Sequence, residues 1–141
     1  MLNQDNFGFL LVGTARLMRR EFQARLENGC LTLAKAKTLI HIALREGIRQ
    51  VELADLLEVK PITLTRMLDQ LVRDGLVERR SDPDDRRVFR LHLLDAAKSH
   101  LDIIESIANE VRAKALAGLD EKQQEAMLGG LRQVRNNLSD R

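Results

Sequence analysis

The sequence predicts a mostly helical fold that contains one small β-hairpin. Only two prolines occur in the 141 residues, Pro61 and Pro83, and neither interrupts a long periodic apolar stretch. Apolar residues recur at helical spacing along most of the chain, but residues 76–93 show the alternation of strands. The length suits one domain, and a composition of 44% hydrophobic and 31% charged residues is that of a globular protein.

Two helices are expected before residue 48. The first covers residues 7–26, where apolar side chains are three or four positions apart, and Asn28–Gly29 ends it. Thr32 is a suitable N-cap for the second, which we expect to run to Glu46 and stop at Gly47. A short helix over about 50–57 follows.

The next helix opens at Pro61 and ends at Gly75, because proline is well tolerated at the first helical position. With about 100° between residues, one face is apolar and predicted to be buried: Leu64, Met67, Leu68, Leu71 and Val72. The opposite face carries Ile62, Arg66, Asp69, Gln70 and Arg73, with Thr63 and Thr65 at its flanks. Gln, Arg and Thr side chains are those that hydrogen-bond base edges and phosphates, so this face predicts a DNA-reading helix.

Two residues at the start of this helix have two possible roles each. Ile62 is apolar yet faces outward, where it would either meet a thymine methyl group or pack on the preceding helix. Lys60 occupies the N-cap position, but its side chain cannot cap the helix. It either helps to bind a phosphate at the helix start or is a solvated turn residue.

The predicted hairpin is rich in arginine. Strands at residues 76–80 and 88–93 flank a loop around residues 81–85, and five arginines between Glu78 and Arg90 stand against four acids. Asp85 precedes Arg87 by two positions, a spacing that lets both carboxylate oxygens hold the guanidinium and aim it. The hairpin would then place an arginine in a narrow minor groove; the alternative is a solvated charged hairpin.

Two long helices complete the chain. One resumes near Asp95 and ends at Gly118, and Asp120 with Gln123 forms a capping box for the last helix, through Leu138. Gly129–Gly130 lies inside it and weakens its predicted continuity.

The composition argues against several function classes. A formal net charge of +2 is too small to imply nucleic acid by itself, and 3% aromatic residues disfavour base stacking on single strands.

The single Cys30 excludes an internal disulfide and is expected to be a small buried hydrophobe, with no basic neighbour to support a redox role. The histidines lack metal-ligand spacing and no glycine-rich phosphate loop occurs, so we predict no enzyme, metal or cofactor. Without a long apolar run or a basic start typical of a signal peptide, we expect a cytoplasmic protein.

A short helix, a tight turn, a second helix and a hairpin follow the order of a winged helix-turn-helix. Long apolar helices at both ends exceed what such a unit needs, with Phe9, Val12, Leu17, Ile103 and Leu116 widening their apolar stripes. An intertwined homodimer would bury this surplus, and a fuller monomeric core is the alternative.

The stretch VELADLLEVKPITLTRMLDQLVRDGLVERRSDPDDRRVFRLHLLDAA resembles the core of MarR-family transcriptional regulators, closer to the SlyA-like branch. The run from Asp82 to Arg87 and the segment leading into Gly75 carry the likeness, and the flanking helices extend it over nearly the whole chain. The resemblance implies base contacts by Ile62, Thr63 and Arg66. It also implies that Arg87 enters the minor groove with Asp85 as its partner. Dimerisation is implied through the first helix and the last two helices.

The same resemblance implies that a small aromatic acid or phenolic compound releases the DNA. Three positions depart from the family pattern. Glu58 stands where such turns often carry glycine, Leu94–Asp95 replaces a threonine and a charged residue, and Cys30 is not at the position of the family's peroxide-sensing cysteine. Arg16, Arg20, His41 and Arg45 are candidates for a ligand pocket, or else surface charges.

The sequence therefore predicts one domain over residues 1–141, with a helix-turn-helix at about 50–74, a wing at 76–93 and dimerisation helices at 5–28 and 95–139. Its predicted function is sequence-specific binding of a pseudo-palindromic DNA operator by a homodimeric, ligand-released repressor. The alternative is a winged-helix adaptor that binds proteins and not DNA. The predicted DNA-binding residues are Lys60, Pro61, Ile62, Thr63, Thr65, Arg66, Gln70, Arg73, Asp85, Arg86 and Arg87.

Overall fold

A computed structural model describes residues 2–27 and 31–139, so that the predicted helix stop at Asn28–Gly29 and the burial predicted for Cys30 lie outside the described residues. The elements are α1 (Phe7–Leu26), α2 (Leu33–Leu44), β1 (Ile48–Arg49), α3 (Gln50–Leu57), α4 (Pro61–Arg73), β2 (Val77–Ser81), β3 (Phe89–Leu93), α5 (Ala97–Ala115) and α6 (Glu121–Ser139). The mostly helical winged-helix fold predicted from the sequence is confirmed.

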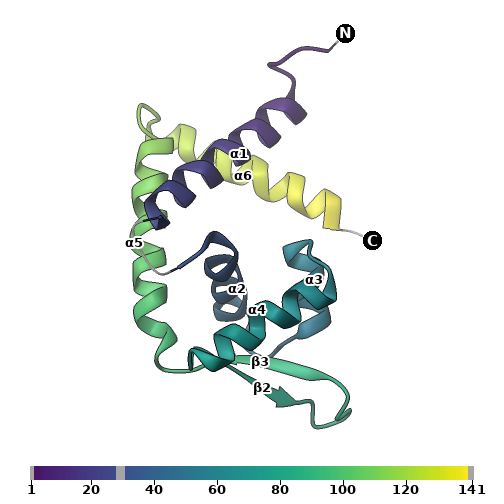
Figure 1. Ribbon diagram of the computed structural model, residues 1–141. Helices are drawn as coiled ribbons and strands as arrows, with labels where there is room; N and C mark the ends of the chain where they lie inside the picture. The colour runs from purple at the N-terminus through teal and green to yellow at the C-terminus, as the bar shows by residue number, and fades with distance from the viewer. Residues whose placement is uncertain (1, 28–30, 140–141) are drawn as a thin grey trace.

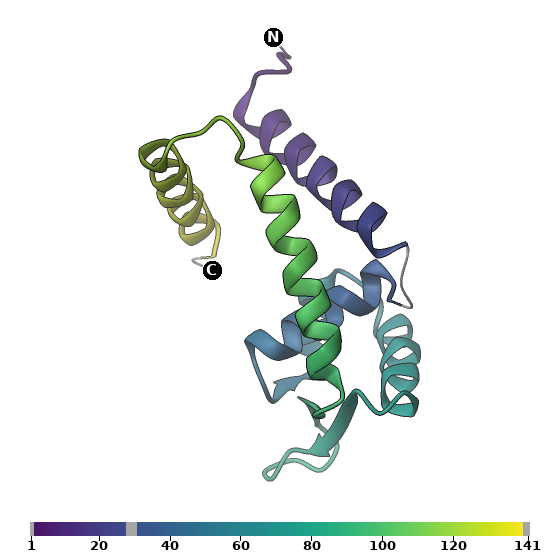
Figure 2. The ribbon, with the colours of Figure 1, turned by 90° about the vertical axis from the view of Figure 1, so that its left-hand side faces the viewer.

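The elements gather at two ends of the molecule (Figure 1). Helices α2, α3 and α4 and the sheet form one lobe, and β2 and β3 extend from it as the wing. Helix α5 runs from this lobe to the opposite end, where α1 lies along it (Figure 2) and α6 begins. The DNA-reading elements that the sequence predicts therefore share one lobe, and the surplus helices lie at the other end.

The core of the winged lobe is built from aliphatic side chains of several elements. Helix α4 contributes Leu64, Leu68 and Leu71, all fully buried, and α2 contributes Leu39 and Ile42. Burying each such side chain stabilises the fold by about 1.5–3 kcal/mol. The apolar face of α4 is thus fixed against the core, which determines the direction in which its other face points. Two residues predicted to be buried are not: Met67 is half-buried, and Val72, at the edge of this face, is 38% exposed.

The sheet has three antiparallel strands in the order β1-β3-β2, whereas the sequence predicts only a two-stranded hairpin. Arg80 pairs with Arg90 and Val77 with Leu93 across the hairpin, and β1 adds the pair Ile48 and Leu91. Strand β1 has two residues, too few to show an alternating pattern. Its pairing with β3 ties the entrance of α3 to the base of the wing.

The helix ends largely follow the predicted signals. Thr32 accepts a hydrogen bond from the Lys35 amide, which confirms it as the N-cap of α2. The helix ends at Leu44 and not at the predicted Glu46, because Arg45 leaves helical geometry with a φ of −146°. The Asp120–Gln123 capping box is confirmed by reciprocal hydrogen bonds of 3.0 and 2.8 Å. Helix α6 continues through Gly129–Gly130 without a break.

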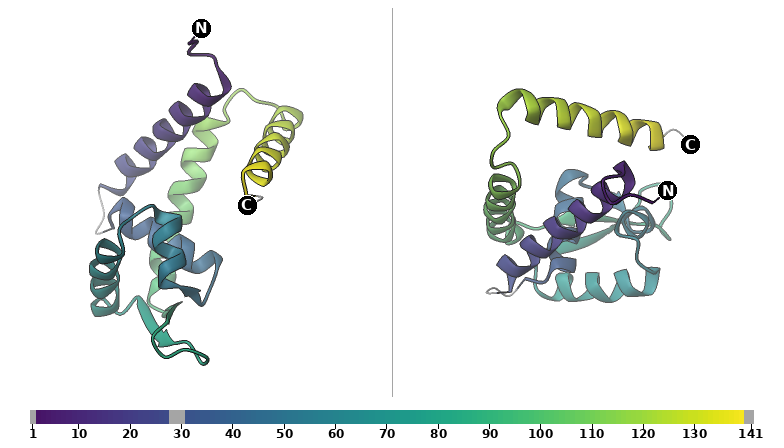
Figure 3. Two further views of the ribbon diagram at one scale, coloured as in Figure 1. Left: turned by 90° about the vertical axis from the view of Figure 1, so that its right-hand side faces the viewer. Right: turned by 90° about the horizontal axis from the view of Figure 1, so that it is seen from above.

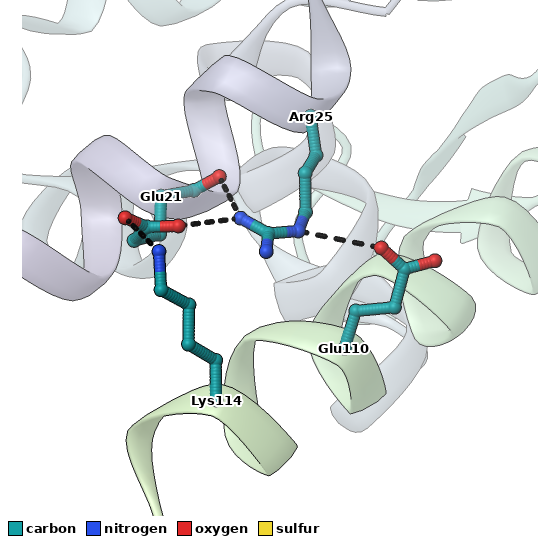
Figure 4. Close-up of polar contacts among 4 residues, drawn as sticks. All are labelled: Glu21, Arg25, Glu110 and Lys114. Carbon is teal, nitrogen blue, oxygen red and sulfur yellow. Dashed lines mark hydrogen bonds and ion pairs between the residues drawn. The ribbon is translucent and has the colours of Figure 1, made fainter.

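Four charged side chains join α1 to α5 (Figure 4). Glu21 accepts hydrogen bonds from Lys114 Nζ at 2.8 Å and from Arg25 Nη1 at 2.7 Å, and Arg25 Nε lies 3.3 Å from Glu110 Oε2. The pKa of Glu21 is lowered to about 2, first by the hydrogen bond from Lys114 and then by that from Arg25. This network links the two helices where they lie side by side.

The helices at the end opposite the wing expose a large apolar surface in the single chain. Helix α6 buries none of its residues, and it stands apart from the other helices (Figure 3). The exposed large apolar side chains of these helices include Phe7, Phe9, Leu10, Val12, Leu17, Met18, Ile103, Met127, Leu128, Leu131 and Leu138, whereas Leu116 is half-buried. Among the described helices, none is both long and apolar enough to cross a membrane.

Candidate nucleic-acid interface

Helices α3 and α4 are joined by a tight turn that contains a left-handed residue. Glu58 adopts φ 53° and ψ 41°, and among the described residues it is the one non-glycine with positive φ. Its amide and that of Val59 bond back to Asp55 and Ala54, which closes the turn. The expectation that Glu58 occupies a glycine-like position is therefore confirmed. The turn fixes the direction of α4 relative to α3, and one face of α4 is left on the outside of the lobe, where it can contact another molecule.

The outward face of α4 is open to solvent, as the sequence predicts. Ile62 is 58% exposed, which favours the outward role over packing on the preceding helix. Thr63, Arg66, Gln70 and Arg73 are exposed on the same helix. Within the described residues neither Arg66 nor Arg73 has a carboxylate partner. These side chains are free to meet base edges and phosphates.

The N-terminus of α4 carries no side-chain cap. Lys60 holds the cap position with extended backbone geometry, and Pro61 occupies the first turn. Both residues are exposed, so the free amides of the first turn and the Lys60 ammonium face solvent together. A helix start of this kind favours an anion such as a phosphate.

Thr65 differs from its neighbours because its hydroxyl is engaged within the protein. The Thr65 hydroxyl donates to the Pro61 carbonyl at 3.0 Å and accepts from Gln50 Nε2, also at 3.0 Å. It is half-buried, so it has less freedom to contact DNA than the exposed Thr63. Sequence reasoning missed Gln50, which links the start of α3 to α4; its position at the first residue of a helix is the one signal for it.

Sequence reasoning also missed Arg79 of β2, which crosses to α4. Its Nη2 donates to Asp69 Oδ1 at 2.7 Å and to the Thr65 carbonyl at 3.3 Å. The pair neutralises the one carboxylate on the outward face of α4. In the sequence, ten positions separate the two residues, and the link becomes visible only when the hairpin is folded onto the helix.

The wing places Arg86 and Arg87 in its exposed loop. Asp85 Oδ1 accepts from the Arg87 amide at 3.0 Å and from Arg87 Nε at 3.3 Å, so the predicted pairing occurs. It uses one carboxylate oxygen and not two as expected, because the same oxygen also closes the turn. The Arg87 side chain is 91% exposed and projects from the loop.

A second carboxylate anchors the same loop from inside. Asp82 is only 3% exposed, and its Oδ2 accepts from Arg90 Nε at 2.6 Å. Its Oδ1 accepts from the Asp84 amide at 2.9 Å, and Arg90 Nη1 donates to the Gly47 carbonyl at 2.9 Å. The Asp84 amide, followed by Arg90, lowers the pKa of Asp82 below its usual value, so the carboxylate is charged at neutral pH.

Of the four residues considered for a ligand pocket, Arg16 and Arg20 line one open hollow on α1, whereas His41 and Arg45 are not part of it. Arg16 and Arg20 are exposed on α1 beside Arg19, while Arg45 pairs with Glu52 at 3.1 Å on the winged lobe. His41 is half-buried on α2. Over the part of the chain that the structure describes, no group of three or more His, Cys, Asp or Glu side chains could hold a metal ion.

Comparison with known proteins agrees with this architecture. A sequence model of the MarR family matches residues 31–89. The structure of transcriptional regulator PA3341 is 37% identical, with a TM-score of 0.83 over 96% of this chain and 100% of that one. Wild-type MarR from E. coli, in its apo form, is 25% identical, with a TM-score of 0.81 over 94% of this chain and 98% of that one.

A DNA complex shares the fold. The transcriptional repressor CouR, bound to a 23-mer DNA duplex, is 24% identical, with a TM-score of 0.75 over 96% of this chain and 99% of that one. The family match covers the helix-turn-helix and most of the wing, and the relative that is 37% identical spans the flanking helices as well. The chain therefore belongs to the MarR family of transcriptional regulators.

Proposed function

We propose that the chain is a repressor that binds a pseudo-palindromic operator in double-stranded DNA as a homodimer and is released by a small aromatic acid or phenolic ligand. The exposed polar face of α4 beside an arginine-bearing wing is the observation that carries the proposal. We assign the DNA-binding unit to residues 50–74 with the wing at 76–93, and dimerisation to residues 5–28 and 95–139, within a single domain.

Base reading is assigned to the first turns of α4. Ile62, Thr63 and Arg66 are exposed there, on a helix whose other face is fixed in the core. An arginine donates two hydrogen bonds to guanine in the major groove, and an apolar side chain meets the thymine methyl group. The structural relative CouR was solved on a DNA duplex, which supports this use of the fold.

Phosphate contacts are assigned to the residues around this reading surface. Lys60 and Pro61 lie at the uncapped helix start, Gln70 and Arg73 lie further along α4, and Arg86 is on the wing. Thr65 would contribute through its position and not its hydroxyl, which is already paired. Such contacts fix the protein on the duplex without reading its sequence.

The wing arginine is assigned to the minor groove. Arg87 is almost fully exposed, yet the Asp85 carboxylate holds its backbone amide and Nε, which restricts where the side chain can point. A narrow A·T-rich minor groove has a strongly negative potential and favours an inserted arginine.

Dimerisation is supported by the apolar residues that the single chain leaves exposed. Helix α6 has no fully buried residue within its own chain, and the first half of α1 exposes Phe7, Phe9, Leu10, Leu11 and Val12. A large exposed apolar surface marks an interface. A second copy would cover it and present two α4 helices to successive turns of the major groove, about 34–36 Å apart.

An open groove of about 250 Å³ between α1, α2 and α5 is our candidate for the effector site. Its lining is almost entirely apolar, with Phe22 and Ile40 among the residues, and it has two cations, Arg19 and Lys37. Neither has a carboxylate partner among the described residues. This chemistry fits an aromatic ring with an acidic group, and the related fold of Bordetella bronchiseptica BpsR belongs to a protein whose DNA binding is regulated by 6-hydroxynicotinic acid.

Titration of the chain with the duplex upstream of its own gene tests the proposal. We expect affinity to fall steeply as salt rises, because phosphate contacts release counterions, and transcription in vitro from that promoter to fall as the chain is added. A chain that binds no duplex at any salt concentration would instead support the winged-helix adaptor. Release of the complex by salicylate and not by the neutral salicylamide, with the release lost in Lys37→Met, tests the effector site.

A further inference from the structure

The loop of the wing is held by the charged pair Asp82 and Arg90, neither of which is among the residues assigned to DNA. Asp82 stands where β2 leads into the loop, and Arg90 lies on β3. The backbone closes beside them, since the Asp82 amide donates to the Val88 carbonyl at 2.8 Å. Residues 83–87, which include both loop arginines, therefore form a loop whose base is anchored by the contact between Asp82 and Arg90.

Arg90 also fixes the wing relative to the helix-turn-helix. While Nε binds Asp82 Oδ2 at 2.6 Å, Nη1 of the same guanidinium donates to the Gly47 carbonyl at 2.9 Å. Gly47 immediately precedes β1, which leads directly into α3. One planar group thus connects the base of the loop to the entrance of the helix-turn-helix, a geometry that a lysine ammonium on a flexible chain does not reproduce.

We propose that Asp82 and Arg90 are positioning residues that fix the wing loop at one distance from α4, so that Arg87 enters the minor groove while α4 reads the major groove. The inference rests on the proposed DNA-binding function and adds to it a pair that contacts no DNA itself. The near-complete burial of Asp82 supports it, because a buried carboxylate is held in place by its partners and is strongly disfavoured without them.

The sign of the effect separates positioning from simple electrostatics. Asp82→Asn removes a negative charge from a DNA-binding loop, so electrostatics alone predicts tighter binding. Arg90→Lys leaves the charge unchanged, and electrostatics alone predicts no effect. Positioning predicts that both variants bind more weakly. Asp84→Asn is the matched control, because Asp84 is an exposed acid of the same loop whose side chain makes no hydrogen bond or ion pair within the described residues.

The experiment uses a duplex that the wild-type chain selects from a random pool, with its flanks rewritten as A·T or as G·C pairs. We expect Asp82→Asn and Arg90→Lys each to weaken binding to the A·T-flanked duplex by about fivefold or more, the effect of one lost groove contact. The ratio of the two affinities should fall to that of Arg87→Ala, while Asp84→Asn keeps the wild-type ratio. Because the same molecules bind both duplexes, the ratio does not depend on any unfolded fraction.

Two results would overturn the inference. One is a wild-type chain without a preference between the flanks, and the other is a ratio in Asp82→Asn and Arg90→Lys that matches that of Asp84→Asn. In either case the proposed function survives as long as the wild-type chain binds duplex in a salt-dependent way. Failure of the wild-type chain to bind any duplex is the separate result that removes the proposed function.

Discussion

Arg79 on β2 and Asp69 on α4 form an ion pair of 2.7 Å that joins the wing to the outward face of the helix. Asp69 is the one acid among the residues on that face, where a free carboxylate would repel phosphates. The arginine cancels this charge and also donates to the Thr65 carbonyl, so the same side chain steadies the helix. The interface is therefore more basic than the sequence of α4 alone indicates.

The pair should show compensating effects on DNA affinity. Arg79→Gln leaves Asp69 uncompensated and should weaken binding by about fivefold or less, the usual range for an exposed ion pair. Asp69→Asn should bind at least as tightly as wild type, and the double variant should return close to it. Affinities measured for the four proteins at two salt concentrations test this cycle. A double variant as weak as Arg79→Gln would mean that the arginine acts through structure and not through charge.

The turn before α4 should be improved by glycine. Glu58 holds a left-handed conformation that costs a non-glycine residue about 1–2 kcal/mol, partly offset because glycine loses more freedom on folding. Glu58→Gly should therefore raise the free energy of unfolding by about 0.5 kcal/mol. Urea denaturation provides the measurement. Asp55→Gly, in the helical part of α3, is the control and should destabilise; destabilisation by Glu58→Gly as well would contradict the assigned geometry.

Acid should weaken the junction of α1 and α5. The folded-state pKa of Glu21 is lowered from 4.5 to about 2, so its stabilising contribution is complete above the unfolded-state value and is lost as pH falls through the folded-state value. Glu21→Gln should therefore lower the melting temperature at pH 7, and the difference from wild type should shrink as pH approaches 2. Glu105→Gln, an exposed acid on α5 without an ion pair in the described chain, should show no such trend. A difference that stays constant with pH would contradict the role of this network.

A charge on the apolar stripe of α1 should separate the proposed dimer. Leu10 is 51% exposed in the single chain, and a second copy would bury it. Leu10→Glu should shift the mass measured by sedimentation equilibrium from dimer to monomer and weaken operator binding, because two linked half-site contacts become independent. Leu44→Glu is the control, since Leu44 is 79% exposed on the winged lobe. A dimer that tolerates Leu10→Glu would place the interface elsewhere.

Local signals were sufficient for much of the fold. The apolar period of α4, its proline start and the Asp120–Gln123 capping box act within one or two turns of helix, so they can be recognised without tertiary contacts. The outward direction of Ile62 and Arg66 follows from the same period. The predicted end of α2 and the predicted burial of Val72 were wrong. Both concern the edge of an element, where neighbouring segments determine where a helix ends and which side chains are covered.

The contacts missed from the sequence join residues from different elements. Strand β1 exists because Ile48 pairs with Leu91, and no pattern within two residues reveals it. Arg79 and Arg90 both looked like members of one arginine-rich run, yet the fold turns one toward α4 and the other toward Gly47. The alternation of strand faces separates them, and only the folded hairpin shows what each face meets.

Selection of duplexes from a random pool by the wild-type chain and by Arg66→Ala tests the central claim most directly. Lys122→Ala, at the start of α6, is the control, because it removes one positive charge as Arg66→Ala does. We expect the wild-type chain and Lys122→Ala to enrich the same two-fold repeat, with half-sites about one helical turn apart. The Arg66→Ala protein should lose about 1–3 kcal/mol of DNA-binding free energy per site and should accept other bases at one position of each half-site. An Arg66→Ala protein that recovers the same sequences with the same affinity would contradict the claim that the outward face of α4 reads DNA.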